Sequence, residues 1–130
     1  MVGELDATIS VFDEDASGRW RLLASLATSS YDDGPAYPSH IVYGDGHLYV
    51  ANRTPSTISV FIHGDDTLAL VGEVATGGEW PRHFAVVGND LVVANERSHE
   101  LTWLRLRLGL PVEVARREPT PSPTCVVTAG

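Results

Sequence analysis

The sequence repeats a unit of about 43 residues, and this repeat restricts the folds that the chain can adopt. Residues 40–53 match residues 83–96 at a constant offset of 43, without a gap. Both segments begin with His and contain Ala-Asn near their ends. A duplication of this length indicates one structural unit that is repeated in space, each copy packing on the next.

A partial third copy precedes these two. Residues 8–12 and 57–61 both read Thr-Ile-Ser-Val-Phe, at an offset of 49 that places Glu4 in register with Arg53. The additional residues fall in the loop 31–36, whose Asp, Gly and Pro residues are typical of turns. At the other end of the chain, Pro-Thr-Cys-Val-Val matches the start of the preceding unit at an offset of 42. The chain therefore contains two full units and parts of two more.

Each unit alternates short runs of β-branched and aromatic residues with turns rich in Gly, Pro and Asp. No apolar period of 3.6 residues persists, so we expect little or no helix. Four strands in about 43 residues is the size of one β-propeller blade. A β-sandwich is the rival fold, but it does not require consecutive units to match residue for residue.

We therefore predict an all-β fold: a β-propeller of about two and a half to three four-stranded blades, forming an incomplete ring. Its expected parts are a partial blade at about 4–28, two blades at about 39–76 and 82–118, and a closing strand at about 123–128. Three blades leave two blade faces bare. We expect these faces to be covered by the remaining blades of a longer protein or by self-association.

The composition excludes several classes of function. Nine Lys and Arg residues against 17 Asp and Glu residues give a formal net charge of -8, which argues against nucleic-acid binding. No apolar run approaches the length of a membrane span, and the first residues lack a secretory signal pattern, so a cytoplasmic protein without a membrane partner is expected. The five His residues lack metal-ligand spacing. We expect neither a metal nor another cofactor.

Glu4, Arg53 and Glu96 occupy equivalent positions, each at the end of the second strand of its unit. If these strand ends lie on one rim of the ring, the carboxylates and the guanidinium lie close together there. Glu4 would then activate water or steer a proton, and Arg53 would bind a carboxylate, a phosphate or a developing oxyanion. The alternative for both residues is a salt bridge between blades.

His40, His83 and Cys125 also occupy equivalent positions, at the start of the innermost strand of each unit. An imidazole facing the central channel can act as an acid or a base near neutral pH. The alternative, favoured by the repetition, is that each ring merely bonds a neighbouring carbonyl. For Cys125, within an apolar run, we predict a buried strand residue and not a nucleophile.

Three further residues are candidates for a site or for the core. Arg82 lies beside a Gly-rich loop and either holds a phosphate or bridges two blades. Trp80, in the same loop, either borders a ligand or is structural. Trp103 alternates with a polar residue and is predicted to lie in the core.

Four segments carry a resemblance to a known family: residues 4–12, 48–53, 76–84 and 121–126. In order and spacing they resemble the last three or so blades of the seven-bladed propeller family of 6-phosphogluconolactonases and carboxy-muconate lactonising enzymes. The resemblance implies a proposed site that includes a glutamate and an arginine, at the positions of Glu4 and Arg53. Seven such units would need roughly 300 residues, so more than half of a ring would lie outside this chain.

The resemblance implies a hydrolase of carbohydrate metabolism that acts on an anionic sugar lactone, by resemblance 6-phosphogluconolactone. Glu4 or His83 would be the base, Arg53 the oxyanion or phosphate clamp, Arg82 an accessory cation and His40 a substrate-binding residue. Two alternatives stay open: cycloisomerisation of a muconate, and a binding propeller or truncated product without activity. Because the family's site draws on other blades, we expect the 130-residue chain alone to be a poor enzyme.

Overall fold

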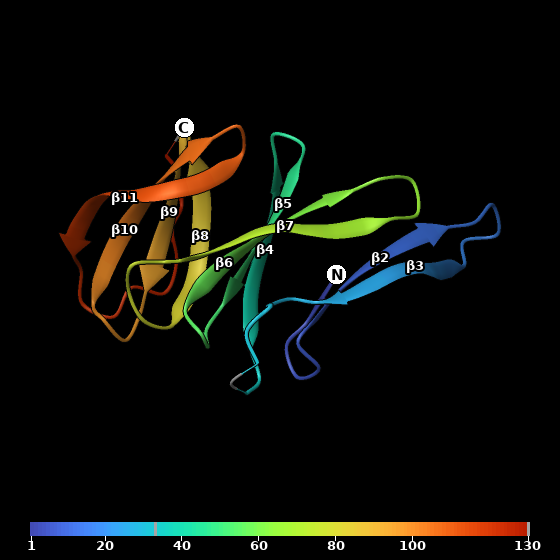
Figure 1. The fold of residues 1–130 in the computed structure, drawn as a ribbon, viewed down its shortest axis with the longest axis horizontal. Helices are drawn as coiled ribbons and strands as arrows, with labels where there is room; N and C mark the ends of the chain where they lie inside the picture. Colours follow the sequence, from blue (N-terminus) through green and yellow to red (C-terminus); the bar gives the residue numbers. More distant parts are fainter. Residues whose placement is uncertain (33, 130) are drawn as a thin grey trace.

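The computed structural model describes residues 1–32 and 34–129 of the chain (Figure 1). Asp33, in the predicted loop 31–36, lies outside the described residues. The described residues form three antiparallel sheets and contain no helix, which confirms the predicted all-β, partial-propeller fold. Within the same residues there is consequently no helix that is long and apolar enough to cross a membrane.

Each sheet is one blade, and its strands follow one another in chain order. Blade 1 contains β1 (Val2–Gly3), β2 (Thr8–Glu14) and β3 (Trp20–Ala27). Blade 2 contains β4 (Pro38–Gly44), β5 (His47–Asn52), β6 (Thr57–His63) and β7 (Leu68–Ala75). Blade 3 contains β8 (Pro81–Val87), β9 (Asp90–Asn95), β10 (Glu100–Arg107) and β11 (Leu110–Pro119). The first strands of blades 2 and 3, β4 and β8, lie next to each other.

The expected closing strand at 123–128 does not form, because no strand is found among the described residues after Pro119. A strand is defined by its ladder to a neighbour. The segment 123–128 corresponds to the first strand of a further blade, and the second strand of that blade is not among the described residues. A repeat in the sequence therefore predicted a strand that lacks its partner here.

Apolar side chains from facing blades form the core. Blades 2 and 3 enclose one cluster of buried side chains: Tyr49, Ala51, Ile58, Val60, Phe84, Leu91, Val93 and Leu104. Blades 1 and 2 enclose a smaller cluster: Ile9, Val50 and Phe61. Tyr49 and Val50 enter different clusters because successive strand residues point to opposite faces. Full burial of each large side chain contributes about 1.5–3 kcal/mol, so the blade interfaces supply most of the hydrophobic stabilisation.

Two buried asparagines connect blades 2 and 3 to the residue that follows the last strand of the preceding blade. Asn52 Nδ2 donates a hydrogen bond to the carbonyl oxygen of Thr28 at 3.3 Å. In the next unit, Asn95 Nδ2 donates to Thr102 Oγ1 at 3.0 Å, and this hydroxyl donates to the carbonyl of Thr76 at 2.6 Å. The Ala-Asn element of the repeat is therefore a polar connection between blades in an otherwise apolar interface.

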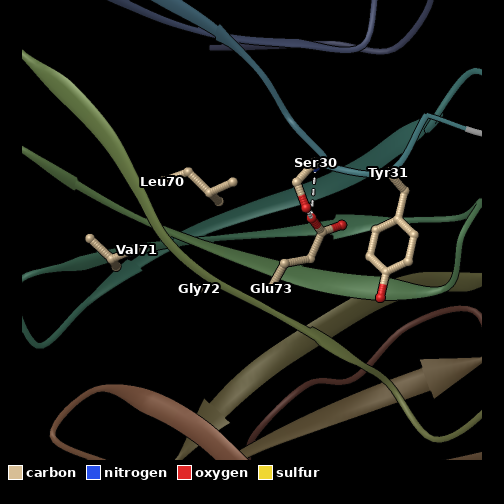
Figure 2. Close-up of a pocket in the computed structure, with 6 residues that line it drawn as sticks. All are labelled: Ser30, Tyr31, Leu70, Val71, Gly72 and Glu73. Atoms are coloured by element: carbon tan, nitrogen blue, oxygen red, sulfur yellow. Dashed lines mark hydrogen bonds between the residues drawn. The ribbon is translucent and has the colours of Figure 1, made fainter.

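Glu73 of β7 holds the linker between blades 1 and 2. Its carboxylate accepts hydrogen bonds from Ser29 Oγ (2.6 Å), from the Ser30 amide (2.7 Å) and hydroxyl (2.8 Å), and from Thr57 Oγ1 (2.7 Å). Figure 2 shows Glu73 turned toward Ser30, with Tyr31 at the border of the same shallow pocket. Burial raises the pKa of Glu73, but these hydrogen bonds outweigh it and hold the pKa below its usual value.

The outer face of blade 1 is apolar and uncovered. Phe12 pairs with Leu22 in the β2–β3 ladder, so their side chains share one face, and Met1, Phe12 and Trp20 line a hollow there. Trp20 is 67% exposed and Leu22 is 54% exposed. Phe61, the equivalent of Phe12 in the repeat, is fully buried between blades 2 and 1. Blade 1 therefore presents a face suited to another blade.

We expect Glu73→Gln to lower the free energy of unfolding at pH 7 by on the order of 1–3 kcal/mol, because the charged acceptor of four hydrogen bonds is lost. The lowered pKa means that the carboxylate stabilises the fold above about pH 4.5, and that this contribution is lost as the pH falls through the folded-state pKa. Urea unfolding at pH 7 and at pH 3 measures the difference. Glu14→Gln, at an exposed position, is the control, and equal losses at both pH values would contradict the assignment.

We expect the 130-residue chain to self-associate through the bare face of blade 1. Trp20→Asp should shift sedimentation velocity profiles toward monomer, because a charge on this face opposes burial. Leu108→Asp is the matched control, since Leu108 is 95% exposed and lies in a turn of blade 3. A monodisperse wild-type monomer over a wide concentration range would disprove this expectation.

Candidate functional site

The turns that follow β1, β5 and β9 lie at one edge of the sheets, together with the linkers between blades. We call this edge the site rim: the turns 4–7, 53–56 and 96–99 and the described linker residues 28–32, 34–37 and 76–80. Backbone hydrogen bonds fasten the turns to the linkers, from the Arg53 amide to the Tyr37 carbonyl and from the Arg97 amide to the Glu79 carbonyl, both at 3.2 Å. The rim is therefore a connected surface.

Glu4 and Arg53 meet on the site rim. Arg53 Nη1 donates to Glu4 Oε1 at 2.6 Å, joining blade 1 to blade 2. The Arg53 side chain is 15% exposed, whereas that of Glu4 is 56% exposed. The inter-blade salt bridge considered from the sequence is thus present, and it also places a carboxylate and a guanidinium side by side. Nη2 and Nε of Arg53 have no hydrogen-bond partner among the described residues.

Arg82 and Glu96 form a second ion pair on the rim. Arg82 Nη1 donates to Glu96 Oε2 at 3.0 Å, and both residues belong to blade 3. Of the two interpretations of Arg82 from the sequence, the bridge between blades is not found among the described residues, because its carboxylate partner comes from its own sheet. Its charge is balanced locally, and its side chain is 44% exposed.

His40 and His83 stack on each other on the neighbouring strands β4 and β8. Their ring centroids are 3.9 Å apart, and the edge of His40 meets the ring of Phe84. The Val126 amide donates to His83 Nδ1 at 3.2 Å, which places the proton of the neutral ring on Nε2. Burial lowers the pKa of both imidazoles, and the proximity of His83 lowers the pKa of His40 further. Both rings are therefore neutral at pH 7.

Within the part of the chain that the structure describes, His83 makes no hydrogen bond to Glu4 or Arg53. His83 hydrogen-bonds the C-terminal segment, whereas Glu4 and Arg53 bond each other. The three predicted catalytic residues consequently form two separate groups, a charged pair and a neutral histidine pair.

A cleft on the rim contains a residue that the sequence analysis missed. The cleft has a volume of about 290 Å³ and is lined by Arg53, Thr54, Pro55, Ser56, Glu79, Trp80 and Arg97. Arg97 Cζ lies 3.5 Å above the ring of Trp80, and the ring of Tyr37 lies 6.4 Å from that of Trp80. Trp80 lines this cleft, a position in which it would border a bound ligand. Arg97 follows Glu96 directly, but nothing in the repeat distinguishes its position.

Two predictions about buried residues are wrong. Cys125 is exposed and lies outside any strand, since the ladder that would enclose it does not form. Trp103 is half-buried, and Arg116 Cζ lies 4.3 Å above its ring. Its equivalent Val60 packs against the following blade. Trp103 points to the side of blade 3 where a following blade would pack.

Across residues 1–32 and 34–129, no group of three or more His, Cys, Asp or Glu side chains is arranged to hold a metal ion. The side chains of the rim offer ion pairing, hydrogen bonding and proton transfer. A carboxylate beside a guanidinium supports proton abstraction from water next to stabilisation of an oxyanion.

The successive four-stranded meanders, each packed face to face on the next, define a β-propeller. The family described as "Lactonase, 7-bladed beta-propeller" matches residues 1–128, and this chain belongs to that family. The resemblance inferred from the sequence is thereby confirmed.

The chain is 31% identical over 108 residues to a 6-phosphogluconolactonase of Pectobacterium atrosepticum, an alignment covering 77% of this chain and 32% of that protein. A crystal structure of a Lactobacillus plantarum protein matches with a TM-score of 0.84 and 26% identity, covering 95% of this chain and 39% of that one. The periplasmic gluconolactonase of Pseudomonas aeruginosa matches with a TM-score of 0.82 and 24% identity, over 93% of this chain and 36% of that one, which supports the fold. The chain spans about a third of its relatives' length.

We expect the free energy of unfolding to fall as the pH is lowered through about 6.5. The pKa values of His40 and His83 are lower in the folded chain than in the unfolded chain, so the unfolded chain binds more protons in this range. Stability is then highest above pH 6.5. His83→Asn should flatten this dependence, whereas His63→Asn, at an exposed position, should preserve it. Thermal melts between pH 5 and 8 measure the slope, and an unchanged slope in His83→Asn would contradict the burial argument.

Proposed function

We propose that this chain supplies part of the active-site rim of a sugar-lactone hydrolase of the 6-phosphogluconolactonase type. The observation that carries the proposal is the Glu4–Arg53 pair, in which the two side chains meet at 2.6 Å on the rim. Membership of the lactonase family and the 6-phosphogluconolactonase of P. atrosepticum support it. Because the chain spans 32% of that relative, the remaining blades would complete the site.

The proposed reaction is addition of water to the lactone carbonyl. The Glu4 carboxylate takes a proton from the attacking water, and the new C–O bond converts the carbonyl into a tetrahedral oxyanion. The Arg53 donors that Glu4 leaves unused stabilise this oxyanion. As the oxyanion collapses, the ring C–O bond breaks, and the leaving alkoxide takes the proton that Glu4 removed from water, which gives the hydroxy acid and restores the Glu4 carboxylate.

The histidines and Arg82 have subsidiary roles in this proposal. Neutral His83 would accept a proton at Nδ1 in exchange for the hydrogen bond from the Val126 amide, and His40, stacked on it, would contact the substrate. Arg82, already paired with Glu96, would add positive potential to the rim. An anionic lactone is the small-molecule partner, and further blades or a second copy of the chain are the protein partners.

Muconate cycloisomerisation, the alternative considered from the sequence, is not favoured. The names of the matched relatives include a 6-phosphogluconolactonase and a gluconolactonase. A propeller without activity is distinguished from the hydrolase by the kinetic experiment below.

We predict that Arg53→Lys lowers kcat/KM for 6-phosphogluconolactone on the order of 10-fold to 1000-fold, the cost of removing one positioned donor. Lysine keeps the charge but loses the forked geometry. The free energy of unfolding should change by about 1 kcal/mol or less, because the pair lies at the rim. Kinetics are measured in a ring that joins this chain to the remaining blades of the P. atrosepticum relative, alongside a melting curve.

The control is Arg107→Lys, an exposed arginine at the other end of the sheet from the site rim, which should leave both measurements unchanged. The 130-residue chain alone should turn over lactone far more slowly than the complete ring. Unchanged kinetics with a large fall in Tm for Arg53→Lys would show that the pair is a structural bridge and not a catalytic one.

A further inference from the structure

Trp80 holds Arg97 at the mouth of the rim cleft. Arg97 Cζ lies over the indole of Trp80, 3.5 Å from the ring centroid. A cation over an aromatic face is attracted by the ring quadrupole, and the contact restricts a side chain that would otherwise sample many rotamers. The edge of the guanidinium, where its N–H donors lie, remains available to a ligand.

The backbone under Trp80 is fixed in an unusual conformation. Trp80 has a φ of 61°, although it carries a large side chain and precedes Pro81. Two hydrogen bonds hold it there: its amide donates to Ser56 Oγ at 3.1 Å, and its carbonyl accepts from the Glu96 amide at 3.1 Å. Tyr37, the equivalent residue of blade 2, has a φ of 45° and also precedes a proline, so this linker conformation repeats between blades. The hydrogen bonds to the turns 53–56 and 96–99 therefore fix the backbone that carries the indole.

The charges of the cleft are unevenly balanced. Arg53, which also lines the cleft, has a carboxylate partner in Glu4, and Arg82 has one in Glu96. Arg97 has no carboxylate within salt-bridge distance among the described residues, although the exposed Glu79 also lines the cleft. Two guanidinium groups therefore border one cleft of about 290 Å³, and one of them lacks a counter-ion.

We propose that Arg97, positioned by Trp80, forms a subsite for a phosphate monoester, and that this subsite makes the rim select phosphorylated over unphosphorylated sugar lactones. The planar fork of a guanidinium suits the oxygens of a phosphate dianion, and Arg53, which lines the same cleft, adds positive charge while its own donors serve the lactone carbonyl. The identity of the sugar rests on the proposed function. Recognition of phosphate by Arg97 and Trp80 does not depend on hydrolysis.

The test is binding of stable anions to the ¹⁵N-labelled 130-residue chain, followed through the Trp indole and Arg Nε–H signals. The probes are 6-phosphogluconate, gluconate and inorganic phosphate at equal concentration. We expect 6-phosphogluconate to shift the Trp80 and Arg97 signals with an affinity about 10-fold or more above that of gluconate. A shift with inorganic phosphate at the same residues would show that the phosphate group itself is recognised.

Three variants separate the parts of the subsite. Arg97→Met should lower the affinity for 6-phosphogluconate about 10-fold or more, Arg97→Lys should restore part of it, and Trp80→Leu should weaken it while retaining the arginine. Arg107→Met, which removes an exposed arginine away from the rim, is the matched control and should bind normally. Equal affinity for gluconate and 6-phosphogluconate, normal binding by Arg97→Met, or no shift at Trp80 and Arg97 would overturn the proposal.

The same results separate this proposal from the hydrolase proposal. Phosphate binding at Arg97 without lactone hydrolysis in the completed ring would reject the enzyme and leave the subsite standing. Hydrolysis without phosphate binding at Arg97 would reject the subsite and leave the enzyme standing.

Discussion

The whole structure depends on the face-to-face packing of neighbouring blades. A single four-stranded blade has two apolar faces, and no helix among the described residues covers either of them. Blade 2 therefore places Tyr49 and Val60 against blade 3, and Val50 and Phe61 against blade 1. The two-residue alternation of a strand requires such an arrangement, because every other side chain points to each face. The stability of the sheets and the position of the rim follow from this packing.

The rim acquires its geometry from the same packing. Asn52 and Asn95 connect the end of each second strand to the preceding blade, which fixes where the following turn emerges. Arg53 and Glu96 are the next residues after these asparagines. The ion pairs of the rim are thus placed by a buried amide one residue away. The hydrogen bonds of the buried asparagines hold the turns in position. The charged side chains of the turns are not needed for this.

The repeat predicted the blades, the absence of helix and the convergence of Glu4 with Arg53, because equivalent positions in packed units lie at equivalent places on the rim. It did not predict Arg97 on Trp80, since that contact joins a turn to a linker at positions that differ between units. It also predicted a strand at 123–128 and a buried Cys125, and both are wrong for one reason. A sequence pattern reports the local preference of a segment, whereas a strand needs a neighbour.

The electrostatic arrangement separates the rim from the rest of the surface. A chain with a net charge of -8 repels an anionic ligand at long range, but exposed charges more than about 8 Å apart are largely screened at physiological ionic strength. Inside the cleft the nearest groups therefore dominate, and Arg53 and Arg97 are among them. The stacked histidines contribute no charge at neutral pH, since burial lowers the pKa of both. On the rim, positive potential comes from the arginines, and an anionic lactone would have to bind there for Glu4 and Arg53 to act on its carbonyl.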